Sequence, residues 1–272
     1  MKLHKTLIAL ALAGAAFSAQ AHKPWLLPSS SMVEAKDAWV TVDAAISEGL
    51  FDIDHQPLKL DGIAVTGPDG AKVGLENALT GKLRSTFDLH LQKPGTYKVA
   101  LVQQSVLASW KAGSEIKRWR GSEEAMAKEV PAQAEELKVS RIHSRLETFV
   151  SANKTDEAVF KPSGVGLELV PLTHPNDLRA GEQAAWRFLL DGKPAANLAF
   201  SLIPGGVRYR GTLGEIRLST DARGEASFTI PAAGMYLVSS AWPAVAAPQP
   251  GQPPQMPPRR VTYAATVEVL PQ

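Results

Sequence analysis

Short stretches of alternating apolar and polar residues, each bounded by turn-forming residues, run through most of the chain. Examples are residues 38–43, residues 62–66 before a Gly-Pro-Asp-Gly turn, and residues 96–102 after Lys-Pro-Gly. Alternation with a period of two is the pattern of a strand that buries one face. Short strands at regular spacing are typical of β-sandwiches, so the pattern predicts an all-β fold.

The alternating pattern repeats in the second half of the chain, after a polar stretch at residues 153–164. Turns such as Asp191-Gly-Lys-Pro separate the expected strands, which are residues 166–171, 184–190, 198–203, 215–218, 226–230 and 234–238. We therefore expect two β-sandwich domains of the Ig-like or transthyretin-like kind, at residues 22–160 and 161–272.

Two segments depart from the strand pattern. Ser122 followed by Glu123 and Glu124 is a helix start, because a serine caps free backbone N–H groups and acids complement the helix dipole. We expect a helical insertion at residues 122–138, interrupted by Pro131, after a hairpin at residues 108–120. Residues 243–258 are rich in proline and predict a stiff exposed loop before the last strand, residues 261–270.

The first 21 residues form a predicted secretory signal peptide. Lys2 and Lys5 precede an apolar run that is too short to span a bilayer, and the segment closes on Ala19-Gln20-Ala21, a signal-peptidase pattern. Cleavage there would give an exported, periplasmic protein that begins with His22.

Composition narrows the chemistry that the mature chain can perform. The chain has 29 basic and 27 acidic residues, and loss of Lys2 and Lys5 with the leader makes these numbers equal. This balance argues against nucleic acid as a partner. The chain has no cysteine, which excludes disulfides, thiolate metal sites and cysteine nucleophiles. Any bound metal must therefore be held by nitrogen and oxygen.

A histidine at the start of the mature chain offers two nitrogen donors, its α-amine and its ring Nδ1. A free α-amine has a pKa of about 7.7 to 8, so a metal displaces its proton near neutral pH. Pro24, the third mature residue, excludes the simple N-terminal copper and nickel motif, which needs histidine there and free backbone amides before it. Other ligands must come from elsewhere in the fold, and we expect His22 to anchor the site.

Further candidate ligands follow predicted strands. His55 directly follows the expected strand 50–54, a position from which it can face a site at the rim of the sheet. Its neighbour Asp54 is expected as an alternate or supporting ligand. His90 shares a strand face with Asp88, which suits either a ligand with carboxylate support or an ordinary solvated face.

The remaining mature histidines and the enzyme motifs add little. His174 lies in a turn-rich stretch and is expected to have a structural role in the contact between domains, while His143 has no supporting context. The sequence contains no Gly-x-Ser-x-Gly, no His-Glu-x-x-His and no phosphate-binding glycine loop. We therefore predict a protein that is not an enzyme.

Several segments together resemble the exported NikM-like family, a domain of unknown function named for an association with nickel uptake. They are His22-Lys-Pro-Trp-Leu-Leu-Pro, Leu50-Phe-Asp-Ile-Asp-His, Phe87-Asp-Leu-His-Leu, Glu147-Thr-Phe-Val, Asp191-Gly-Lys-Pro and, most specifically, Gly166-Leu-Glu-Leu-Val-Pro-Leu-Thr-His-Pro-Asn-Asp-Leu. The resemblance implies a periplasmic, β-rich protein linked to transition-metal uptake.

The expected function is therefore a periplasmic accessory protein that binds a transition metal, as a free ion or a chelate. Nickel or copper suits the expected nitrogen ligands, with zinc and iron as alternatives. Its protein partner would be an outer-membrane receptor or an inner-membrane transporter component. Two alternatives stay open: a copper-dependent oxidase with an N-terminal histidine, as in lytic polysaccharide monooxygenases, and a structural adaptor without metal.

Overall fold

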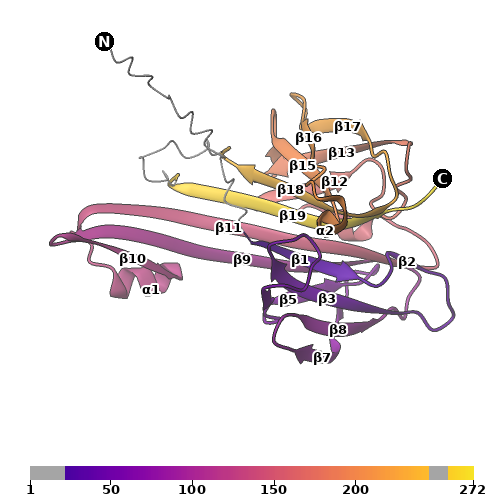
Figure 1. Ribbon diagram of the computed structural model, residues 1–272, viewed down its shortest axis with the longest axis horizontal. Coiled ribbons are helices and arrows are strands. Elements are labelled where there is room, and N and C mark those ends of the chain that lie inside the picture. Colours follow the sequence, from indigo (N-terminus) through magenta and orange to yellow (C-terminus); the bar gives the residue numbers. More distant parts are fainter. Residues whose placement is uncertain (1–21, 245–256) are drawn as a thin grey trace, which may run out of the picture.

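Strands make up most of the computed structural model, which describes residues 22–244 and 257–272 (Figure 1). The expected signal peptide and most of the proline-rich segment 243–258 lie outside the described residues. The helices are short: α1 (Glu123–Glu129), the 3-10 helix η1 (Ala158–Phe160) and α2 (Val207–Arg210). Within the described part of the chain, no helix has the length and apolar character needed to cross a membrane.

The strands form three sheets. One has five strands, in the order β1-β3-β8-β7 with β4 beside β3: β1 (Lys23–Pro28), β3 (Trp39–Ser47), β4 (Gln56–Pro57), β7 (Glu76–Thr80) and β8 (Ser85–His90). A four-stranded sheet contains β12 (Leu167–Pro171), β13 (Gln183–Leu190), β14 (Lys193–Pro194) and β17 (Glu225–Thr229).

The third sheet has ten strands and lies between the other two. Its order is β16-β15-β18-β19-β11-β9-β5-β6, with β10 beside β9 and β2 beside β11. The strands are β2 (Met32–Val33), β5 (Ile63–Thr66), β6 (Lys72–Val73), β9 (Gly95–Ala112), β10 (Glu115–Gly121), β11 (Glu135–Ala152), β15 (Ala199–Pro204), β16 (Ile216–Ser219), β18 (Gly234–Trp242) and β19 (Arg259–Val269).

The two hydrophobic cores lie on opposite faces of this ten-stranded sheet. Successive side chains of a strand point to opposite faces, and β11 uses both. Its Phe149 packs in the C-terminal core with Tyr263, against the four-stranded sheet. Its Leu146 and Val150 pack in the N-terminal core, against the five-stranded sheet. The expected all-β sandwich class is confirmed, and the two sandwiches share their middle sheet.

Parallel pairing of β19 with β11 makes the middle sheet continuous. The register runs from Arg141↔Arg259 to Thr148↔Thr266, so the last strand of the chain completes a sheet begun by the N-terminal half. Strand periodicity specifies which residues are buried and gives no information on partners that are distant in the chain. The division at residues 160 and 161 therefore did not anticipate the shared sheet.

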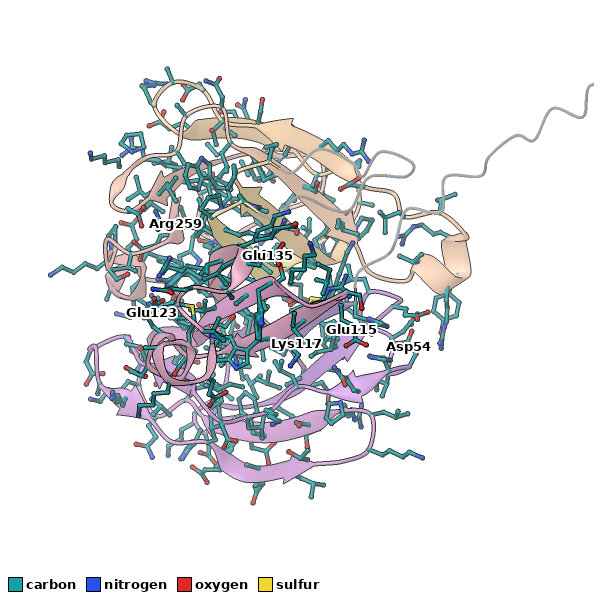
Figure 2. All side chains as sticks on the ribbon, turned by 90° about the vertical axis from the view of Figure 1, so that its left-hand side faces the viewer. Asp54, Glu115, Lys117, Glu123, Glu135 and Arg259 are labelled. Atoms are coloured by element: carbon teal, nitrogen blue, oxygen red, sulfur yellow. The ribbon has the colours of Figure 1, made fainter. Side chains whose placement is uncertain are left out.

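Strands β9 and β11 are each 18 residues long and extend beyond the sandwiches as an arm. The arm also contains β10 and α1, and it is seen end-on in Figure 2, where Glu115, Lys117 and Glu135 mark it. The hairpin expected at residues 108–120 is confirmed, because β9 and β10 pair there from Ala108↔Trp119 to Ala112↔Glu115.

The expected helical insertion at 122–138 is wrong in its second half. Ser122 caps α1 as expected, since its Oγ accepts a hydrogen bond from the Ala125 N–H at 3.1 Å. The helix ends at Glu129, and β11 already begins at Glu135. Pro131 lacks an N–H to continue the helix. Beyond it, β9 offers an unpaired edge, so Lys138 pairs with Ser109 instead of forming a second helical turn.

A small apolar cluster closes the seam between the two sandwiches. Trp25 and Leu50 of the N-terminal half pack with Ile203 and Leu237 of the C-terminal half. The Trp25 indole N–H also donates to the Ser47 hydroxyl at 2.7 Å. This cluster fixes the start of β1 and the loop 48–55, which carry the candidate site.

Candidate metal site at His22

Strand pairing around β3 brings His22 and His55 together. β1 pairs with β3 so that Lys23 lies opposite Ser47, which puts His22 next to the end of β3. Gln56 of β4 pairs with Ile46 of the same strand, and His55 directly precedes β4. The two imidazole rings stack, with 3.8 Å between centroids and 12° between planes. Sequence analysis selected both residues, and the fold makes them neighbours.

A carboxylate completes this group, which we name the His22 cluster: His22, His55 and Glu48. His22 Nε2 lies 3.3 Å from Glu48 Oε1, and the two side chains are 41 % and 69 % exposed. Within the described residues no other hydrogen bond engages either imidazole, so apart from the Glu48 contact the ring nitrogens have no protein partner there. The cluster is therefore open to a ligand from solvent.

The loop between β3 and β4 is braced by its own carboxylates. Both oxygens of Asp54 accept backbone hydrogen bonds, from the N–H groups of Glu48 and Gly49 at 3.1 Å each. Asp52 lies 3.5 Å from Arg208 of α2, across the seam. A Cβ on Gly49 would come within 2.2 Å of Asp52 Oδ2, so a larger residue there would force the Asp52 side chain to move. Asp54, which is labelled in Figure 2, thus shapes the loop that presents His55.

The donor set fits a borderline transition metal in kind. Imidazole nitrogens suit nickel, copper and zinc, and a carboxylate oxygen is an acceptable further ligand. Among the described residues no three histidine or acidic side chains converge closely enough to hold an ion by themselves. The α-amine of a chain that starts at His22 would add one nitrogen donor to the two imidazoles.

His90 lies at the opposite end of β3, paired across from Trp39. The residues from Trp39 to Ser47 place it roughly 26 Å from His22 at about 3.3 Å per strand residue. Its Nε2 is 2.7 Å from Asp37 Oδ1, and its ring stacks on Trp39 with 4.3 Å between centroids. The register of β3 therefore keeps His90 out of the His22 cluster.

Asp88 does not support His90 either. Its carboxylate accepts from the Thr41 hydroxyl at 2.6 Å and from the Asn77 amide at 2.9 Å. These two hydrogen bonds hold the pKa of Asp88 below its usual value. The side chain is engaged in the sheet surface, and it neither binds His90 nor lies in the His22 cluster.

His174 is built into the junction between the sandwiches. The Asn176 N–H donates to its Nδ1 at 3.1 Å, so Nε2 carries the proton and lies 3.0 Å from Thr96 Oγ1 and 3.1 Å from the Asp156 carbonyl. Burial lowers the pKa of His174. With both nitrogens engaged inside the protein, His174 ties β9 to the C-terminal half.

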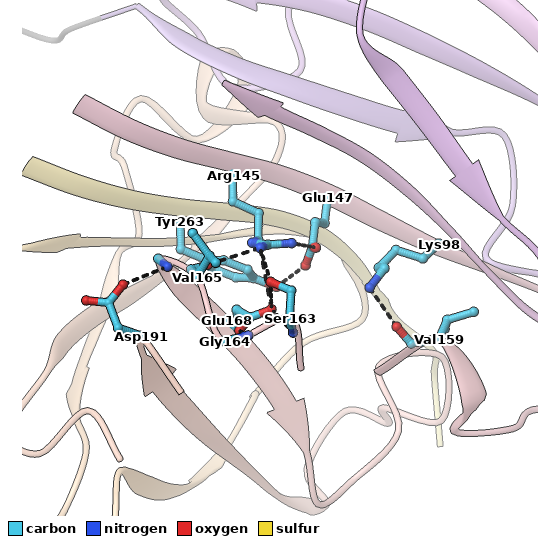
Figure 3. A network of polar contacts seen from close by, with 11 residues as sticks. Lys98, Arg145, Glu147, Val159, Ser163, Gly164, Val165, Glu168, Asp191 and Tyr263 are labelled. Atoms are coloured by element: carbon cyan, nitrogen blue, oxygen red, sulfur yellow. Dashed lines mark hydrogen bonds and ion pairs between the residues drawn. The ribbon is translucent and has the colours of Figure 1, made fainter. Parts of the chain in front are cut away.

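Sequence analysis missed a buried polar network beneath the connection between the sandwiches (Figure 3). Arg145 lies 3.2 Å from Glu147 and 3.4 Å from Glu168, and the Tyr263 hydroxyl donates to Glu147 at 3.0 Å. Burial and the Glu147 carboxylate raise the pKa of Tyr263 well above its usual value. Arg145 and Glu147 share a β11 face with core residue Phe149, which is the sequence signal that was available.

Glu168 fastens the connection to this network. Burial opposes its ionisation, but the N–H groups of Ser163 and Gly164, each at 2.8 Å, and the nearby Arg145 hold its pKa below the usual value. Its role is structural, because its hydrogen-bond donors come from the segment that joins the sandwiches and its ion-pair partner Arg145 comes from β11.

A protein family matches most of the chain. Residues 19–243 match the family described as a domain of unknown function (DUF4198). The chain belongs to the DUF4198 family. No curated protein matches this DUF4198 sequence.

Solved structures similar to the DUF4198 chain are remote. They include the D0-D1 domain of Intimin, with 13 % identity over 90 % of this chain and 97 % of that one, at a TM-score of 0.23. A DUF4785 family protein from Legionella pneumophila has 11 % identity over 79 % of this chain and 50 % of its own, at 0.24. Alpha-2-macroglobulin from Escherichia coli has 12 % identity over 93 % and 20 %, at 0.23.

Proposed function

We propose that this DUF4198 protein is a periplasmic accessory protein of transition-metal uptake, related in role to the NikM-like proteins that it resembles. It binds Ni(II) or Cu(II) at a site anchored by His22. One observation supports the proposal above the others: two histidines chosen from sequence, 33 positions apart by their numbers, stack 3.8 Å apart beside a carboxylate.

The chemistry follows from the donors of the His22 cluster. In the mature protein His22 would supply its α-amine and one ring nitrogen, and His55 a second imidazole. Such nitrogen-rich sets favour Cu(II) and Ni(II) over metals that prefer oxygen. Glu48 would compensate the charge of the ion, and Asp54 would hold the loop that carries His55. In this proposal the bound metal is the cargo that is transported, and no catalytic step is involved.

The binding should release protons. Amine and imidazole nitrogens bind a metal only when they are deprotonated, so acidification competes directly with the metal. We expect the apparent affinity to fall as the pH drops, and calorimetry in buffers of different ionisation enthalpy to show the released protons.

The test separates the amine from the side chains. The protein starting at His22 is compared with one that carries an extra alanine before His22, which turns the amine into an amide and keeps every side chain. We expect roughly tenfold or greater loss of Ni(II) or Cu(II) affinity in calorimetric titrations, about 1.4 kcal/mol or more. The matched control is His90→Ala, which should bind like the unaltered protein.

Each other outcome has a clear meaning. Equal titrations of the two proteins would contradict the N-terminal site. Absence of binding for every metal tried would favour the structural adaptor, and copper binding with peroxide-dependent turnover would favour the oxidase.

A further inference from the structure

An open pocket of about 520 Å³ lies at the seam between the sandwiches, apart from the His22 cluster. Its apolar walls come from both halves: Leu27 of β1 and Phe51 of the loop 48–55 on one side, Ile216 and Met235 on the other. All four side chains are only partly buried. The protein thus leaves apolar surface uncovered inside a concave site, which is typical of small-molecule pockets of about 300 to 1,000 Å³.

The wall formed by Phe51 is held in an unusual conformation. Phe51 has a φ of 62°, in the left-handed region that bulky residues rarely adopt. Its ring packs edge-on against Trp25 with 5.7 Å between centroids. Opposite it, a Cβ on Gly205 would come within 2.7 Å of the ring, so the glycine makes room for it. Strained residues of this kind concentrate at ligand sites, and here the strain keeps an aromatic wall in the pocket.

One cation, Arg210 at the end of α2, also lines the pocket. Its guanidinium donates to the carbonyls of Gly205, Pro204 at 3.0 Å and Leu213 at 3.3 Å. Three backbone acceptors fix the orientation of the group and leave its positive charge in place. Arg210 is therefore a rigid cation at the edge of an apolar pocket.

Two neighbouring arginines are paired with acids. Arg208 lies 3.5 Å from Asp52, and Arg217 lies 2.7 Å from Glu215. Within the part of the chain that the structure describes, Arg210 forms no ion pair. An anion from solvent would meet a charge that the protein has not neutralised.

We propose that this pocket binds a small organic anion with an apolar, aromatic or aliphatic body and a single carboxylate or sulfonate group. The apolar walls take the body, and Arg210 takes the anionic group by charge-assisted hydrogen bonds. A monoanion fits better than a phosphate dianion, because among the described residues that line the pocket one guanidinium is the only charged group. The proposal is independent of metal binding at His22.

The test uses two probes that differ by one charged group. 8-Anilinonaphthalene-1-sulfonate has an aromatic body with a sulfonate, and N-phenyl-1-naphthylamine has the same body without it. We expect saturable fluorescence enhancement with the sulfonate probe, at least tenfold tighter than with the neutral probe. Backbone NMR shifts on the unaltered chain should centre on Phe51 and Met235.

Variants then locate the site. Ala233→Trp, at an exposed position of the rim, should fill the pocket and weaken the sulfonate probe at least tenfold, while the matched control Ser227→Trp on β17 should not. Arg210→Met should weaken the sulfonate probe and leave the neutral probe unchanged. NMR shifts centred elsewhere, equal affinity for the two probes, or unchanged binding in Ala233→Trp would each overturn the proposal. Metal titration of Ala233→Trp should be unaltered, which keeps this test separate from that of the His22 cluster.

Discussion

The two ends of strand β3 carry histidines in contrasting surroundings. At one end His22 and His55 stack on each other with open solvent around them. At the other end His90 binds Asp37 and lies flat on Trp39. Both ends look alike in sequence, as a histidine with an acid nearby. The difference is that the acid next to His90 in space engages its ring, whereas the acid next to His55, Asp54, binds backbone N–H groups and leaves the ring open.

The largest expected difference between the two ends is in metal affinity. The double variant His22→Ala/His55→Ala removes both imidazoles of the His22 cluster and should lower Ni(II) or Cu(II) affinity at least about 100-fold, or about 2.7 kcal/mol. His90→Ala should change it less than twofold, because that ring has no place in the cluster. Calorimetric titration of the unaltered protein and the two variants checks this. Comparable losses of metal affinity in both variants would contradict the difference between the two ends of β3.

His174 shows how much stability a histidine contributes when both its ring nitrogens are engaged inside the protein. His174→Ala removes the acceptor of the Asn176 N–H and the donor to the Asp156 carbonyl, and should lower the free energy of unfolding by about 2 kcal/mol. His90→Ala, at an exposed ion pair, should cost under about 1 kcal/mol. Urea unfolding monitored by tryptophan fluorescence measures both, and equal losses would contradict the assignment.

The same histidine makes stability depend on pH. Burial lowers the pKa of His174 in the folded protein. Below about pH 6.5 the imidazole is therefore protonated in the unfolded chain before it is protonated in the folded chain. The free energy of unfolding should therefore fall as the pH drops from 7 towards 5. His174→Ala should show a shallower slope than the unaltered protein. The pH dependence that remains in this variant is expected from His143, because burial lowers the pKa of that histidine as well.

A change at Gly49 tests whether the His22 cluster depends on the conformation of the loop 48–55. Gly49→Ala puts a Cβ into Asp52 and should distort the loop that presents His55. We expect a loss of about 1 kcal/mol in unfolding free energy and several-fold weaker metal binding. Gly74→Ala is the matched control, because its Cβ would meet nothing within 4 Å. Equal behaviour of the two variants would show that the loop does not position His55.

The smallest effect is expected near His90. Thr41→Val removes the hydroxyl that donates to Asp88, so the pKa of Asp88 should rise toward its usual value. A carboxylate whose pKa is lowered by folding stabilises above its unfolded pKa, and this contribution is lost as the pH falls through the folded value. The variant should narrow the difference in Tm between neutral and acidic pH slightly. Carboxyl NMR titration shows the pKa directly, and metal affinity should stay the same.

The strand pattern predicted the all-β class because burial alternates along each strand whatever its partners are. It could not show that β19 joins β11, since pairing between distant segments leaves no local periodicity. The predicted helix extended too far, to residue 138, for a related reason. Residues after Pro131 have helical composition, yet they form backbone hydrogen bonds with β9 instead.

The candidate site was predictable in part. His22 follows from chemistry at the chain start. His55 was selected at the end of an expected strand, which the structure shows to be part of the loop 48–55, and the fold brings the two histidines together. The separation of His90 depends on the register of β3 with β1 and β8, which spacing in the sequence does not contain. The pairing of Asp54 with backbone N–H groups was invisible for the same reason.

Paramagnetic NMR tests the central claim, that an ion binds at the His22 end of β3 and not at the His90 end. Substoichiometric Cu(II) is added to protein that starts at His22 and carries ¹⁵N-labelled histidine, and the imidazole signals are followed. The account predicts selective loss of the His22 and His55 signals, while those of His90, His143 and His174 persist. Early loss of the His90 signal, or uniform loss of all five, would contradict it.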